Sequence, residues 1–115
     1  MTWGMCRRRW ADPMPLSDIR VIDLTRILAG PFCTQMLADM GADVIKIEPP
    51  AGDPVRGQGI IRDGVSWYFA QFNRNKKSVV LDLYTDEGKE TLARLIEGAD
   101  VLVENYRPGV LDKMG

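Results

Sequence analysis

The chain has 115 residues, which is long enough for one modest domain and too short for two. Hydrophobic residues make up 45% of it and charged residues 27%, a balance that excludes a wholly disordered protein. Fifteen Lys and Arg residues against sixteen Asp and Glu residues give a net charge of −1, so no overall basic field predicts a nucleic-acid partner. No stretch of about eighteen apolar residues predicts a membrane span.

Cysteine and histidine usage limits the chemistry further. Cys6 and Cys33 have neither metal-site nor redox-motif spacing and are too few for a disulfide scaffold, so we expect a reducing, cytoplasmic setting and no metal site. Cys33 is expected to be a small core residue. Histidine is absent, so any chemistry in these residues proceeds without an imidazole base.

Residues 1–14 differ from the rest, with three consecutive arginines and no hydrophobic alternation. The arginines would suit a mitochondrial targeting segment, but the stretch is short and has no serine. We interpret it as a disordered or misassigned leader without function. Met14 is then the natural start, and the domain covers residues 15–115.

From residue 20 onward, short apolar runs alternate with helical patterns, which indicates βαβ units and a parallel sheet. The predicted strands cover residues 20–24, 43–47, 78–83 and 100–105.

Helices are expected between these strands. The first opens at Pro31, where a missing amide proton costs nothing. Residues 66–72 predict a short helical turn, and a longer helix begins at a cap of Thr85 or Asp86 and ends at Gly98. The apolar face of the first helix holds Phe32, Met36, Leu37 and Met40.

Two further features concern a long loop and the end of the predicted domain. The connection over residues 48–66 is rich in Pro and Gly, and a loop of this length without evident secondary structure is usually disordered or functional. A last helix begins near Pro108 and has only just started at residue 115, which favours a truncated domain.

Ligands of open parallel sheets lie beyond the carboxyl ends of the strands. For Ala29, Gly30 and Pro31, an ordinary strand-to-helix turn is the better local explanation, because the spacing matches neither a dinucleotide-binding nor a phosphate-binding loop. Arg56 either pairs with a phosphate or carboxylate or is simply solvated. Asp82, predicted in the middle of a strand, either accepts from a ligand or faces solvent.

Two local clusters are more suggestive. Asn105, Tyr106 and Arg107 combine an amide, an aromatic face and a cation, which suits an adenine nucleotide, although a capped strand end is the alternative. Residues 73–77, "NRNKK", form either a solvated loop or part of an anion site. Asp23 and Asp39 have no visible partner and receive no role.

Three segments in this order resemble the family III CoA-transferases, which include formyl-CoA transferase, carnitine CoA-transferase and alpha-methylacyl-CoA racemase. They are "PLSDIRVIDLTRILAGPFCTQMLADMGADVIKIEPPAGDPVR", "NRNKKSVVLDL" and "ADVLVENYRPGVLDKMG", and the resemblance covers residues 15–115. It implies an α/β fold with a Rossmann-like parallel sheet and flanking helices, of which this chain is the truncated N-terminal part of a larger CoA-binding domain. It also implies that the whole protein is an interlocked homodimer.

The resemblance implies acyl-CoA as a substrate, with no tightly bound cofactor. Pro49 stands where relatives often carry an arginine, so the phosphate contact of that position is expected to be lost or to pass to Arg56. Whether Lys76 or Lys77 touches a phosphate stays open. The positions that match CoA-contacting residues are Leu28, Ala29, Leu81, Asp82, Leu83, Tyr84, Asn105, Tyr106, Arg107 and Lys113.

The activity implied is transfer of CoA between an acyl-CoA and a small carboxylic acid. The segments "NRNKKS" and "VENYRPG" are more similar to transferases, including those for dicarboxylates with succinyl-CoA as donor, than to the racemases. The catalytic aspartate of the family lies beyond residue 115, so we expect no catalytic residue here and no activity from this segment alone. The alternatives are a racemase that shifts the proton alpha to the thioester, and a non-catalytic CoA-binding remnant.

Overall fold

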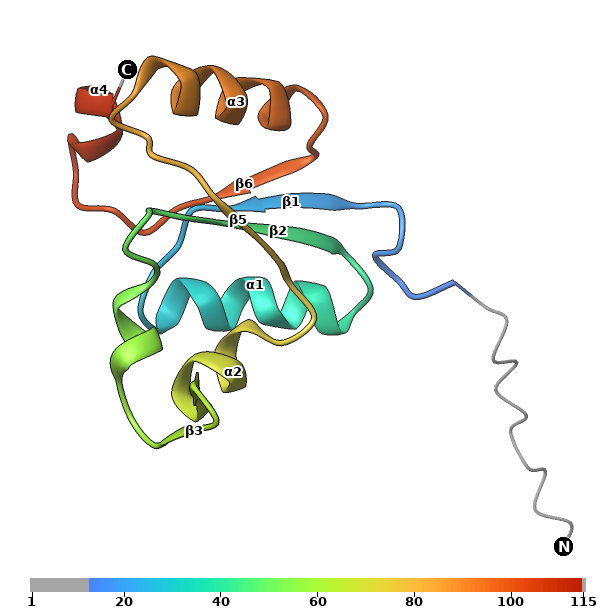
Figure 1. Ribbon diagram of the computed structural model, residues 1–115. Helices are drawn as coiled ribbons and strands as arrows, with labels where there is room; N and C mark the ends of the chain where they lie inside the picture. The colour runs from blue at the N-terminus through green and yellow to red at the C-terminus, as the bar shows by residue number, and fades with distance from the viewer. Residues whose placement is uncertain (1–12, 115) are drawn as a thin grey trace, which may run out of the picture.

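A computed structural model of the chain describes residues 13–114. All but the last two residues of the predicted leader lie outside this range. The core is a parallel four-stranded sheet in the order β5-β2-β1-β6 (Figure 1), which confirms the predicted α/β class. Its strands are β1 (Arg20–Asp23), β2 (Asp43–Glu48), β5 (Lys77–Val80) and β6 (Val101–Val103).

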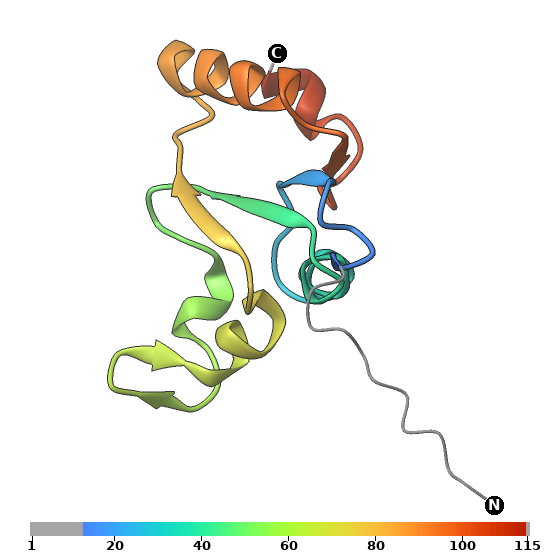
Figure 2. The same ribbon diagram turned by 90° about the vertical axis from the view of Figure 1, so that its right-hand side faces the viewer.

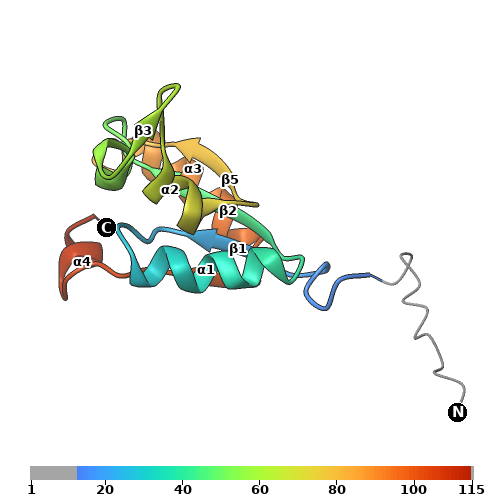
Figure 3. The same cartoon turned by 90° about the horizontal axis from the view of Figure 1, so that it is seen from below.

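Helices cover both faces of this sheet. Helices α1 (Ala29–Asp39) and α2 (Trp67–Asn73) lie on one face, and α3 (Asp86–Glu97) and α4 (Val110–Met114) lie on the other (Figures 1 and 2). Viewed from below in Figure 3, α1 runs along β1 and α2 lies beside it.

The long connection after β2, expected to be disordered or functional, is structured. It contains the 3₁₀ helix η1 (Pro54–Gly57) and an antiparallel hairpin of β3 (Ile61–Arg62) and β4 (Val65–Ser66). Asp53 caps η1 by accepting a hydrogen bond from the Val55 amide. The sequence pattern missed these elements because each is too short to show a period.

The two faces of the sheet differ in chemistry, because side chains alternate along a strand. Toward α3, the strands present Ile22 and Ile47 to an apolar cluster that includes Leu92 of the helix. Toward α1, an apolar cluster of Val21, Ala38, Ala42 and Val44 gives way at the carboxyl ends to Asp23, Lys46 and Glu48, all buried.

This polar edge explains why, of the predicted apolar face of α1, only Leu37 packs against the apolar cluster. Phe32, Met36 and Met40 are 48%, 45% and 41% exposed, and Cys33 is exposed rather than in the core. The helix instead buries Thr34, whose hydroxyl donates to Asp23 at 2.6 Å. A polar strand end selects a polar helix face, and the periodicity of α1 alone does not reveal this.

The turn after β5 also departs from expectation. The predicted strand over 78–83 ends at Val80, so Asp82 is not in mid-strand. Its carboxylate accepts from the Tyr84 amide at 3.0 Å, which closes a local turn before α3. Helix α3 itself begins as predicted, with Thr85 accepting from the Gly88 amide at 3.1 Å, and is capped at its end by Gly98.

We predict that Gly30→Ala destabilises the fold by about 1–3 kcal/mol, because the added methyl group overpacks the junction of β1 and α1. A Cβ atom at Gly30 would lie 2.3 Å from the Cβ of buried Thr25. Urea unfolding measures the loss, and Gly57→Ala is the control, since nothing lies within 4 Å of a Cβ there. Equal stability of the two variants would contradict the close packing.

Candidate functional site

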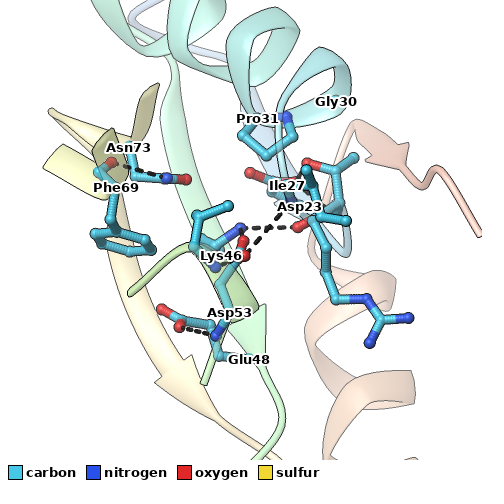
Figure 4. Close-up of polar contacts among 12 residues, drawn as sticks. Asp23, Ile27, Gly30, Pro31, Lys46, Glu48, Asp53, Phe69 and Asn73 are labelled. Atoms are coloured by element: carbon cyan, nitrogen blue, oxygen red, sulfur yellow. Dashed lines mark hydrogen bonds and ion pairs between the residues drawn. The ribbon is translucent and has the colours of Figure 1, made fainter. Parts of the chain in front are cut away.

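Three ion pairs, Lys76–Asp23, Lys46–Asp53 and Arg56–Glu48, form a polar network at the carboxyl edge of the sheet, and all of their side chains except that of Arg56 are buried. Figure 4 shows Asp23, Lys46, Glu48 and Asp53 of this network. At its centre, Asp23 Oδ2 accepts from Lys76 Nζ at 3.0 Å and from the Thr34 hydroxyl. Lys76 Nζ also donates to the Pro31 carbonyl and to Asn73 Oδ1, both at 2.9 Å. Burial lowers the pKa of Lys76, and the Asp23 charge opposes that shift. All three ammonium protons thus have acceptors within the protein.

A second pair links the β1–α1 loop to the connection after β2. Lys46 Nζ lies 2.9 Å from Asp53 Oδ2 and donates to the Thr25 carbonyl at 2.7 Å. Asp53 Oδ1 lies 3.4 Å from the amide nitrogen of Ile27, which donates to it. Ile27 has a φ of 73°, a left-handed conformation that disfavours a β-branched residue. The buried pair therefore holds a strained loop in place.

The third pair joins Glu48 to Arg56, one of the predicted ligand contacts. The guanidinium donates to both carboxylate oxygens of Glu48 at 2.6 Å and lies 3.7 Å from the centre of the Phe69 ring. Burial raises the pKa of Glu48, but hydrogen bonds from Arg56, the Ser78 hydroxyl and the Asp53 amide outweigh it and lower the pKa to about 2. Arg56 thus already has a carboxylate partner inside the protein.

The basic segment 73–77 is engaged internally in the same way. Arg74 Nη2 and Asn75 Nδ2 donate to the two oxygens of Asp39 at 2.6 and 2.7 Å, and Lys77 pairs with Asp43. Asn75 also takes a left-handed φ of 63°, which asparagine tolerates. These contacts fix the segment that leads into β5. The sequence did not identify Asp23 and Asp39 as the partners of these side chains.

Seven of the ten remaining predicted residues gather around two neighbouring cavities. The first, which we call the tyrosine cavity, has a volume of about 320 Å³ and contains Tyr84 and Tyr106 in its wall. It also includes Leu81, Asp82 and Leu83, so five predicted residues from two separate segments meet here. Leu83 is mostly buried, whereas Tyr84 is 82% exposed.

The second, the arginine cavity, has a volume of about 400 Å³ and shares Arg26, Tyr106 and Val110 with the first. Asn105 and Arg107 complete its polar wall, and no acidic residue of the described chain lines it. Burial raises the pKa of the Tyr106 hydroxyl, which the Arg26 charge opposes. The hydroxyl is therefore a hydrogen-bond donor at neutral pH.

Asn105 has a structural task in this wall. Its Oδ1 accepts from the Arg26 amide and its Nδ2 donates to the Arg26 carbonyl, both at 2.9 Å. The Arg26 guanidinium lies 4.8 Å from the centre of the Tyr106 ring. Sequence reasoning missed Arg26, although it lies two residues after a predicted strand end, where ligand contacts are expected.

Four predicted residues lie outside the walls of both cavities. Leu28 and Ala29 are exposed at the start of α1 and follow Ile27, which lines the arginine cavity. Lys113 is exposed on α4, whose Val110 contributes to both walls. Arg56 is held by Glu48, as described.

Within residues 13–114, no group of three or more His, Cys, Asp or Glu side chains is arranged to hold a metal ion. In the same range, no helix combines the length and apolar character needed to cross a membrane.

We predict that Asp23→Asn lowers the free energy of unfolding by about 3–5 kcal/mol, because Lys76 then keeps a buried charge without a counter-ion. Asp43→Asn is the matched control, since its partners Arg20 and Lys77 are exposed, and it should cost about 1 kcal/mol or less. Urea unfolding compares the two variants. Equal effects would mean that burial does not govern the strength of these pairs.

A pH-dependent prediction concerns Glu48. Its folded pKa of about 2 lies below its ordinary value of 4.5, so its stabilisation is complete above pH 4.5 and is lost as the pH falls toward 2. Glu48→Gln should therefore reduce stability by up to about 3 kcal/mol at neutral pH, and the difference from wild type should shrink through that window. Denaturation between pH 2 and pH 7 measures it, with exposed Glu97→Gln as the control. A pH-independent difference would contradict the ionic role.

Curated relatives of this chain are CoA-transferases. The succinyl-CoA:mesaconate CoA-transferase of Haloarcula hispanica is 50% identical over 103 residues, which are 85% of this chain and 26% of that protein. The formyl-CoA:oxalate CoA-transferase of Afipia carboxidovorans is 50% identical over 102 residues, covering 87% of this chain and 24% of that protein. The chain thus spans about a quarter of the length of these relatives.

The fold comparison agrees with the sequence comparison. The crystal structure of a CaiB/BaiF family protein from Brucella suis superposes with a TM-score of 0.84 at 45% identity, over 90% of this chain and 29% of that one. The family model described as CoA-transferase family III matches residues 16–115. The chain belongs to CoA-transferase family III.

Proposed function

We propose that the protein to which these residues belong transfers CoA between an acyl-CoA and a small carboxylic acid, and that this chain supplies part of the CoA-binding surface. One observation carries the proposal. Residues 81–84 and 105–107, predicted as CoA contacts from separate motifs, meet around Tyr106 at the carboxyl edge of the sheet. Such an edge is the usual ligand position in this architecture.

The two cavities offer the chemistry that a nucleotide thioester needs. The tyrosine cavity has aromatic and aliphatic walls, which suit an adenine ring or the pantetheine arm. The arginine cavity provides guanidinium groups, which suit phosphate oxygens. Together they make a surface that is apolar on one side and cationic on the other.

The relatives named above support the finer assignment. Their names join a CoA thioester donor to a dicarboxylic acid acceptor. We propose succinyl-CoA with a dicarboxylic acid as the substrate pair for the whole protein, with CoA as a substrate rather than a resident cofactor. An interlocked homodimer and a cytoplasmic setting remain parts of this proposal. Residues 15–115 would form the N-terminal part of the CoA-binding domain.

The resemblance also implies that this chain binds CoA, while a carboxylate elsewhere in the protein carries out the catalysis. A carboxylate of the family attacks the thioester carbonyl and expels the CoA thiolate, which leaves a mixed anhydride between enzyme and acyl group. The thiolate then attacks the enzyme carbonyl of the anhydride, which releases the donor acid as a carboxylate and forms an enzyme-bound CoA thioester. No position of this chain matches that aspartate, so these residues bind and orient CoA. We expect the 115-residue chain by itself to bind CoA without transferring it.

Calorimetric titration of the chain with CoA tests the binding role. Saturable binding is expected, and Arg107→Ala and Lys113→Ala should each weaken it roughly tenfold, because each removes a charge-assisted contact. Arg62→Ala is the control, because Arg62 of β3 lies 4.8 Å from the centre of the Trp67 ring at the start of α2 and lines neither cavity. No binding by a folded chain, or equal loss in all three variants, would refute the proposed site.

The reaction itself is tested on a protein of full family length. CoA transfer from succinyl-CoA to a panel of dicarboxylic acids is expected, with formation of the new thioester followed by mass spectrometry. Exchange of the proton alpha to the thioester in deuterated water, without any transfer, would favour the racemase instead.

A further inference from the structure

The arginines within residues 13–114 fall into two groups, those with and those without a carboxylate partner in this range. Arg20, Arg56 and Arg74 each pair with a carboxylate of the protein. Arg26 has no ion-pair partner among residues 13–114, although it is half-buried and lines both cavities. A partly desolvated guanidinium without a counter-ion is unfavourable unless something else neutralises it.

Arg26 is also fixed at its base. The Asn105 side chain bonds both its amide and its carbonyl, as described above. The next residue, Ile27, is held in its left-handed conformation by contact with Asp53. These contacts fix the backbone at Arg26 and its neighbour, which limits the positions that the Arg26 side chain can reach. Little conformational entropy is therefore lost when a ligand binds.

The guanidinium itself contacts an aromatic ring. It lies 4.8 Å from the centre of the Tyr106 ring, and this ring belongs to both cavities. A guanidinium carries five N–H donors, so contact with one ring leaves donors available for hydrogen bonds.

Arg56 shows what such a group does when its site is complete. Its guanidinium stacks at 3.7 Å on Phe69 and donates both edge hydrogen bonds to Glu48. Arg26 likewise lies over an aromatic ring, at 4.8 Å, but has no carboxylate partner among residues 13–114. The edge of its guanidinium has the donor geometry that matches an oxyanion with two acceptor atoms.

We infer that Arg26 binds an oxyanionic group of the ligand through the edge of its guanidinium, in the arginine cavity. The inference rests on the proposed function, which supplies two sources of this chemistry: a phosphate of CoA and the carboxylate of the acid. Arg107, the second cation in this cavity, adds positive charge for the same group. Arg26 thus joins the substrate-binding residues, and Asn105 acts as its positioning residue.

Titration of Arg26→Gln with CoA, 3′-dephospho-CoA and succinate tests the inference. We expect at least one of these probes to bind roughly ten- to a hundredfold more weakly than to wild type, with a smaller dependence on salt. A loss seen with CoA but not with 3′-dephospho-CoA identifies the 3′-phosphate as the partner. An equal loss with both identifies the diphosphate, and a loss confined to succinate identifies the carboxylate.

Arg62→Gln is the matched control, because Arg62 also lies 4.8 Å from the centre of an aromatic ring but lines neither cavity. It should bind every probe as wild type does. If wild type binds and Arg26→Gln binds all probes equally well, the inference is wrong and the proposed function stands. If folded wild type binds none of them, the proposed function fails and the inference fails with it.

A measurement on the wild-type chain covers the case in which Arg26→Gln does not fold. A dicarbonyl reagent that modifies arginine should react with Arg26 more slowly in the presence of a bound probe, while Arg62 reacts at an unchanged rate. Mass spectrometry of the digested protein separates the two sites. Equal reaction of Arg26 with and without the bound probe would overturn the inference.

Discussion

The structure depends on the pairing of buried charges on the α1 side of the sheet. Asp23, Lys46 and Glu48 point into the same layer because their strands run in register and alternate with period two. Each would be strongly unfavourable there alone, so each carries a partner: Lys76, Asp53 and Arg56, respectively. The partners come from the loops that follow β2 and α2. The requirement to neutralise buried charge therefore fixes those loops as well as the sheet.

The candidate site follows from this constraint. Asp53 holds Ile27 on one side of the β1–α1 loop, and Asn105 holds Arg26 on the other. With both residues fixed, the ring of Tyr106 forms a wall shared by two cavities. Lys46, Lys76 and Arg56 pair with carboxylates of the protein and serve the architecture, whereas Arg26 and Arg107 have no acidic partner among residues 13–114. The presence or absence of an internal counter-ion therefore distinguishes the structural cations from the candidate ligand contacts.

How much the sequence predicts depends on how local each signal is. The four strands and α3 are predicted because apolar runs, the Thr85 cap and Gly98 act within a few residues. The buried face of α1 cannot be predicted in this way, because Thr34 faces inward to donate to Asp23, which lies in another element. The apolar neighbours of Asp82 predict a strand, but the Asp82 carboxylate instead closes a turn by accepting from the Tyr84 amide. At the site, residues 81–84 and 105–107 do meet, whereas Arg26 required the structure.

The segment 73–77 shows why clustered charge is a poor guide to a ligand site. Five polar residues in a row suggest an anion nearby, but the anions that meet them are Asp23, Asp39 and Asp43 of the same chain. The pairs Lys76–Asp23 and Arg74–Asp39 join positions 53 and 35 residues apart. A local sequence pattern does not indicate pairs that are so far apart along the chain. Composition alone therefore cannot distinguish a cation that pairs with a carboxylate of the protein from one that is available to a ligand. What separates the two groups is burial without an internal partner, and this places Arg26, a single arginine in an apolar stretch, ahead of the basic cluster as the ligand contact.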